Sequence, residues 1–94
     1  MEDQEEQLVR MGEAAEVLLD SDAFSSTVNQ LVDASFQNFT NSTPDESVKR
    51  EAAYHHYRAL VDIVSTLQQR VAVRDEIMSK NEADNTNQEE ATGP

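Results

Sequence analysis

The fold of this chain depends on one stretch, Thr43 to Lys80, which reads TPDESVKREAAYHHYRALVDIVSTLQQRVAVRDEIMSK. It opens with a helix-start signature. Thr43 is a favoured N-cap residue, Pro44 suits the first helical position, and Glu46 can complete a capping box. No glycine or proline follows Pro44 in the stretch. We therefore predict one long helix over 44–80, roughly 55 Å in length at 1.5 Å per residue.

Apolar residues recur along this helix at alternating steps of four and three, starting from Ala53, which is the spacing of a heptad seam. The other helices are too short to cover its whole length, so we expect the later part to be an exposed interaction surface. The alternative is that the first helix of the same chain covers it. The predicted interface residues are Tyr57, Leu60, Val64, Leu67, Val71, Arg74 and Met78.

Charged residues add to this pattern. Glu46 and Arg50 have the favourable order and spacing for an ion pair along a helix. Arg70 and Arg74 are like charges four residues apart, and Arg74 occupies a seam position. We expect both arginines to meet acidic side chains of another chain, with the acidic first helix as the candidate.

A second helix is predicted over about 22–39. Asp20-Ser21-Asp22 supplies favoured N-cap residues, and all three phenylalanines of the chain follow. Because phenylalanines are the largest apolar groups here, we expect this helix to anchor the core. The short polar loop before Thr43 predicts an antiparallel hairpin with the long helix. The predicted core residues are Leu18, Phe24, Val28, Leu31, Phe36 and Phe39.

A first helix is predicted over about 7–19, with one apolar face. Gly12 lies inside it and costs about 1 kcal/mol relative to alanine, so a start nearer Glu13 is the alternative. Residues 81–94 contain no apolar residue larger than alanine before the final proline. They cannot bury enough surface to offset chain entropy, which predicts a disordered acidic tail.

Length and composition point to a single all-α domain over 1–80, either a helical hairpin or a three-helix arrangement built on the long helix. The 94 residues include no cysteine, which excludes disulfides and thiolate metal sites. No apolar run approaches a membrane span, and the acidic N-terminus is unlike a signal peptide. We expect a cytosolic protein.

The net charge of −12 is concentrated at the ends of the chain. Residues 1–22 carry eight acids and one base, and 81–94 carry four acids and no base, whereas 44–80 is neutral with six of each. Such a balance repels free nucleic acid, which binds through basic groups. It favours either plain solubility or a basic protein partner.

Residues typical of catalysis or metal binding are not arranged for either. The only histidines, His55 and His56, are adjacent and point about 100° apart on a helix. The only glycines, Gly12 and Gly93, exclude a phosphate loop. The serines lack a neighbouring base. We expect no metal, no cofactor and no enzymatic activity.

Taken as one pattern over residues 8–75, the chain resembles short helical proteins encoded by tailed bacteriophages near the portal and packaging genes. The resemblance implies a role in virion structure, assembly or genome packaging, and transfers no catalytic residue. It implies the host cytoplasm during synthesis, and the virion, as locations. The matching residues are Leu18-Leu19, Phe24, Leu31, Thr43, Asp45, Arg50-Glu51-Ala52, Arg58-Ala59-Leu60 and Leu67.

The leading hypothesis is a non-enzymatic interaction protein that works as an oligomer through its long helix, with itself and with portal or capsid protein as partners. The alternative is an acidic inhibitor that mimics DNA and binds a basic host protein. The neutral long helix argues against the mimic, which needs acid along its structured surface.

Overall fold

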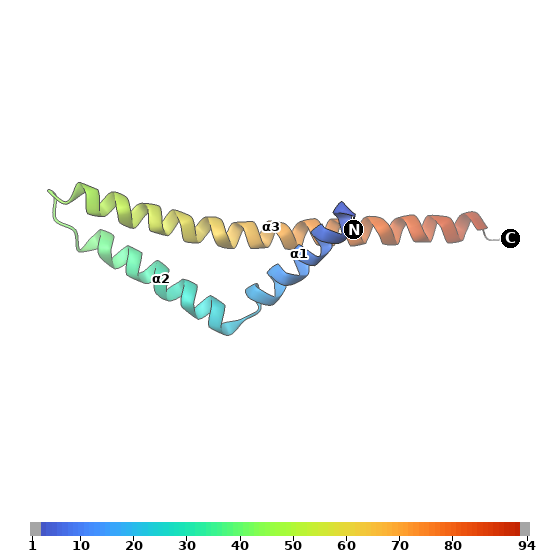
Figure 1. The fold of residues 1–94 in the computed structure, drawn as a ribbon, viewed down its shortest axis with the longest axis horizontal. Coiled ribbons are helices and arrows are strands. Elements are labelled where there is room, and N and C mark those ends of the chain that lie inside the picture. The colour runs from blue at the N-terminus through green and yellow to red at the C-terminus, as the bar shows by residue number, and fades with distance from the viewer. Residues whose placement is uncertain (1–2, 93–94) are drawn as a thin grey trace. The chain divides into compact units, whose positions relative to one another are not determined.

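The computed structural model describes residues 3–92, with side chains as far as Asp84. This part of the chain forms three helices and no strand: α1 (Gln4–Leu19), α2 (Asp22–Thr40) and α3 (Ser47–Thr92) (Figure 1). The predicted all-α class, with one long final helix, is confirmed. Gly93 and Pro94 of the predicted tail lie outside the described residues.

Side-chain caps place the starts of the first two helices. The Glu6 backbone N–H donates to the Asp3 carboxylate at 2.8 Å, so α1 begins about three residues before the predicted start. The Phe24 backbone N–H donates to the Ser21 hydroxyl oxygen at 3.2 Å, and Ser21 has the extended backbone of an N-cap. Ser21 therefore starts α2 where the sequence predicted.

The turn before α3 differs from the predicted capping box, because 43–46 form a turn and the helix begins at Ser47. Half of the box is present: the Thr43 backbone N–H donates to the Glu46 carboxylate at 2.9 Å. The Thr43 hydroxyl does not accept a helix N–H. It donates instead to the carboxylates of Asp45 at 2.6 Å and Glu46 at 2.8 Å. Two nearby charged acceptors thus take the hydroxyl away from its expected partner.

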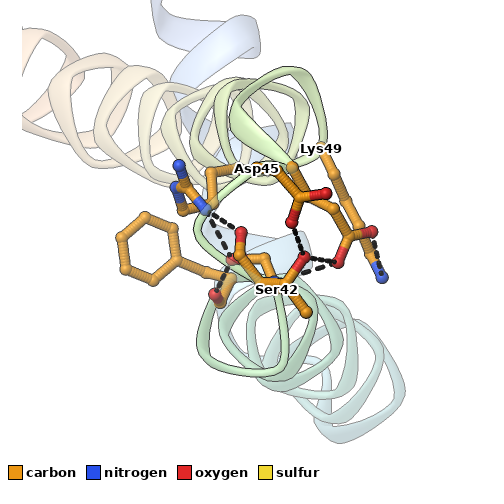
Figure 2. Close-up of polar contacts among 7 residues, drawn as sticks. Ser42, Asp45 and Lys49 are labelled. Atoms are coloured by element: carbon orange, nitrogen blue, oxygen red, sulfur yellow. Dashed lines mark hydrogen bonds and ion pairs between the residues drawn. The ribbon is translucent and has the colours of Figure 1, made fainter.

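Arg50 closes this turn from the side of α3. Its guanidinium donates to the backbone carbonyl oxygens of Thr43 and Pro44, the latter at 3.1 Å. Figure 2 shows the neighbouring polar contacts of the turn around Ser42, Asp45 and Lys49. The predicted ion pair of Glu46 with Arg50 is replaced by one with Lys49 at 3.6 Å. Arg50 therefore serves as a clamp on the loop carbonyls rather than as half of a helix-surface pair.

The end of α3 also differs from the prediction. The helix continues past Lys80 to Thr92, just before the sequence reaches Gly93-Pro94. Adding a residue to an existing helix needs no new nucleus and no burial, so polar residues without a glycine or proline can extend it. Residues 81–84 are exposed, as expected of a segment with no large apolar side chain.

The chain divides into two compact units, to each of which α3 contributes part of its length. The hairpin unit, Leu18–Thr66, contains α2 and the first half of α3. These run antiparallel, close together at the turn and diverging away from it, which confirms the predicted hairpin (Figure 1). The terminal unit contains α1 as far as Val17 and α3 from Leu67 onward.

Candidate interaction surface

The buried positions are occupied almost entirely by small residues. In the hairpin unit, Ser35 of α2 and Ala53 of α3 are buried. In the terminal unit, Gly12 and Ala15 of α1 are buried, together with Leu67 of α3. Small side chains let two helix backbones approach closely, and so they occupy the contact lines of both helix pairs. Leu67 is the only large apolar side chain buried among the described residues.

The predicted phenylalanine core is therefore largely wrong for the isolated chain. Phe36 and Phe39 are 65% and 47% exposed, and Leu18 and Leu31 are also exposed. Phe24 and Val28 are only half-buried. Ser35 occupies the contact line with α3, and Phe36 and Phe39 lie beside that line on the flank of α2.

The exposed aromatic side chains are not scattered but line a groove near the turn of the hairpin unit. The groove has a volume of about 340 Å³. Its buried lining residues are the small Ser35 and Ala53, and its exposed ones are aromatic. The aromatic residues of the groove are Phe36, Phe39, Tyr54 and Tyr57. We call this feature the aromatic groove.

The predicted interface residues on α3 fall into three levels of exposure. Leu67 is buried within the terminal unit, at 8% exposure. Tyr57 and Met78 are exposed. The half-buried positions are Leu60, Val64, Val71 and Arg74. The seam residues thus form a stripe of reduced exposure along α3. The residues at its two ends, Tyr57 and Met78, are more exposed than Leu67.

Arg74 finds its acidic partner inside the same chain. Its guanidinium forms ion pairs with Asp75 at 2.8 Å and with Glu16 of α1. Hydrogen bonds to Asp75 and Glu16 raise the pKa of Arg74 above its ordinary value. The acid comes from the first helix, as expected, but from the same chain, so the expected contact of Arg74 with another chain is wrong.

Gly12 marks the closest approach of α1 to α3 within the terminal unit. A Cβ atom at this position would lie 2.7 Å from the Arg70 backbone oxygen and would overlap the Cβ of Arg74. Only glycine fits there without movement of the backbone. The helix-propensity cost of Gly12, which made the start of α1 ambiguous, is offset by this packing.

The histidine and carboxylate side chains are the remaining candidates for a chemical role. His55 is exposed, and its ring meets that of Tyr54 edge-on with centroids 5.7 Å apart. No group of three histidine, aspartate or glutamate side chains gathers as a metal site within the described part of the chain. No helix in that same part is long and apolar enough to cross a membrane.

Comparison with known proteins adds no relative. No protein-family model, no curated protein sequence and no solved structure matches this chain. The resemblance to phage proteins therefore rests on the residue pattern alone.

Sequence reasoning missed the roles of Ser35, Tyr54 and Gly12. The signal for Ser35 and Tyr54 was present: a small residue on each helix, Ser35 and Ala53, is followed directly by an aromatic one. That pairing is typical of a close helix contact flanked by large side chains. For Gly12, no feature of the local sequence identified Arg70 and Arg74 as its neighbours.

Proposed function

We propose that this chain is a non-enzymatic helical interaction protein that works by self-association. The observation that supports this proposal is the position of its large apolar side chains. Eleven of them are exposed among the described residues, whereas Leu67 alone is buried. Burying half of a large apolar side chain contributes about 1 kcal/mol, so the isolated chain leaves much of its apolar stabilisation unused.

The setting we propose is the assembly of a tailed-phage virion or the packaging of its genome. Support comes from the resemblance over residues 8–75, and from the long exposed helix, a form suited to contacts with large partners. In this setting the seam positions that remain accessible contact a second copy, the portal or the capsid. Those positions are Tyr57, Leu60, Val64, Val71 and Met78.

Self-association is tested by sedimentation equilibrium of the full chain over a wide concentration range. We expect a dimer or larger species whose population rises with concentration. It should persist at high salt, because apolar burial survives screening that weakens charge contacts. A monomer at every concentration would contradict the proposal.

The phage setting needs its own test. We expect the chain to co-purify with assembled particles or their precursors when it is expressed with the neighbouring portal and capsid proteins. Its absence from both would contradict the setting and leave self-association unaffected.

One observation keeps the acidic inhibitor as a second candidate. Residues 1–17 and 67–94 carry twelve acids and four bases, a net charge of −8. Glu5, Glu6 and Glu13 of α1 are exposed, whereas Glu16 is held by Arg74. If neutralising the three exposed glutamates abolishes binding to a basic DNA-binding protein, and Tyr57→Ser does not, the inhibitor is favoured.

A further inference from the structure

We propose that the aromatic groove is the surface through which the chain pairs with a second copy of itself, two hairpin units packing as a four-helix bundle. This inference rests on the proposed self-association and assigns it to a site. It differs from the sequence-based expectation, which placed the contact on the later part of the seam.

The shape of the groove suits an interdigitated contact. Buried Ser35 and Ala53 leave room between the helices, and exposed aromatic side chains flank it on both. Phe36 and Tyr54 are 65% and 55% exposed, so most of each ring faces solvent. In a symmetric pair, the rings of one copy can enter the space beside the small residues of the other.

The groove supplies about half of the apolar area of a standard interface. An aromatic side chain buries about 150–250 Å², so the four of the groove, each about half exposed, offer roughly 400 Å². A standard interface needs about 800 Å² per partner, and smaller ones are typical of weak complexes. Leu31, Val48 and Ile63 of the same unit are also exposed, but at about 100° per residue they lie on the opposite flank of their helices from the groove. The groove by itself therefore fits a weak dimer whose population depends on concentration.

The two helices of the hairpin unit also match in length. α2 has 19 residues, and α3 contributes Ser47–Thr66, so both arms are roughly 30 Å long. Two hairpins of equal arms joined by short turns are the components of an antiparallel four-helix bundle.

The charge distribution favours a second copy over a basic partner at this site. α2 has two acids and no base, whereas residues 47–66 have three bases and two acids, giving net charges of −2 and +1. The α2 of one copy therefore meets no net like charge on the α3 of the other, where Lys49 and Arg58 already pair with Glu46 and Asp62. Residues 18–66 carry −4 against −8 for the rest of the chain, so a basic partner would prefer the terminal unit.

The experiment compares groove variants with exposed variants of the terminal unit in the full chain. Phe36→Ser and Tyr54→Ser remove rings that line the groove, and Val17→Ser and Met11→Ser are the controls, at 70% and 39% exposure in the wild type. We expect the dimer dissociation constant to rise at least tenfold for the groove variants and less than twofold for the controls, by sedimentation equilibrium. Circular dichroism checks that helix content is unchanged.

A cross-linking measurement keeps the inference testable even if a groove variant loses helix. The chain has no cysteine, so Phe36→Cys and Tyr57→Cys variants can be mixed and treated with a short bis-maleimide. We expect cross-linked heterodimers in this mixture and few in a mixture of Val17→Cys with Met11→Cys. Equal cross-linking in both mixtures would overturn the inference.

The outcomes separate the two proposals. If the wild type self-associates and the groove variants match the controls, the groove is not the surface, and self-association occurs through another face. If the wild type is monomeric throughout, the groove belongs to a different partner and both proposals fail.

Discussion

The hairpin unit and the terminal unit each consist of one helix packed on part of α3. They differ in whether a large apolar side chain is buried between the two helices. In the terminal unit, Leu67 is buried and Arg74 is tied to Glu16. In the hairpin unit, only Ser35 and Ala53 are buried, and the aromatic rings lie outside.

This difference shows that burial here follows distance from the helix contact line rather than hydrophobicity. Where backbones approach through small residues, large side chains next to the contact line are displaced to its flanks. In the terminal unit, the flank is covered by a charged side chain that pairs within the chain. In the hairpin unit, the flank is apolar and exposed. Variants in each unit test this contrast, at a fixed protein concentration because association of any kind adds to apparent stability.

The largest effect is expected from Leu67→Ala, compared with Ile63→Ala one turn earlier on α3. Leu67 is buried, so its truncation leaves a cavity and should lower the free energy of unfolding by about 2–3 kcal/mol. Ile63 is 49% exposed and should cost less than about 1 kcal/mol. Urea unfolding followed by circular dichroism measures both. Similar costs for the two variants would remove the distinction between the units.

Gly12→Ala tests the close approach in the terminal unit. Alanine is the better helix former by about 1 kcal/mol, but its Cβ would collide with the Arg70 backbone oxygen. We expect a net loss of about 1–2 kcal/mol, since backbone must shift to admit the methyl group. Glu13→Ala, on the exposed side of the same turn, should stay within about 0.5 kcal/mol. A gain in stability for Gly12→Ala would show that α1 does not pack there.

Arg50→Gln tests the clamp on the turn of the hairpin unit, with Arg58→Gln as its control. Arg50 donates to two backbone carbonyls, and we expect its loss to cost about 1 kcal/mol. Arg58 forms an exposed pair with Asp62 at 3.2 Å and should cost less than about 0.5 kcal/mol. Thermal unfolding of both variants provides the measurement, and equal shifts in Tm would argue against the clamp.

The smallest effect concerns pH. The Thr43 hydroxyl lowers the pKa of Asp45, and the backbone N–H and hydroxyl of Thr43 lower the pKa of Glu46, from ordinary values of 3.8 and 4.5. A carboxyl whose pKa is lower in the folded state stabilises the fold above its unfolded pKa. That contribution is lost as pH falls through the folded pKa. The turn should therefore weaken below about pH 4.5.

Thr43→Val removes the hydroxyl and should flatten the fall of Tm between pH 5 and pH 2. Thr27→Val is the control, because the Thr27 hydroxyl donates to the Ala23 carbonyl oxygen and to no carboxylate. If Tm falls equally steeply between pH 5 and pH 2 in the wild type and in Thr43→Val, this account of the turn is contradicted.

Local sequence was sufficient wherever the determining contacts are local. The N-cap at Ser21, the Glu46 half of the capping box and the long helix that follows all involve partners within a few residues, although the helix begins at Ser47 rather than at Pro44. The same reasoning failed for the hydroxyl of Thr43, because two neighbouring carboxylates competed for it. It also placed the end of α3 too early, since it equated the absence of apolar residues with the absence of helix.

By itself, the sequence determined that this is an all-helical chain with one long final helix and a hairpin turn before it. Caps, breakers and apolar period act over one or two helical turns and need no tertiary partner. Only the tertiary structure decided which side chains are buried, because burial depends on how closely two helices approach. That approach placed Gly12 against Arg70 and Arg74, buried Ser35 and Ala53, and left the phenylalanines exposed on the flank.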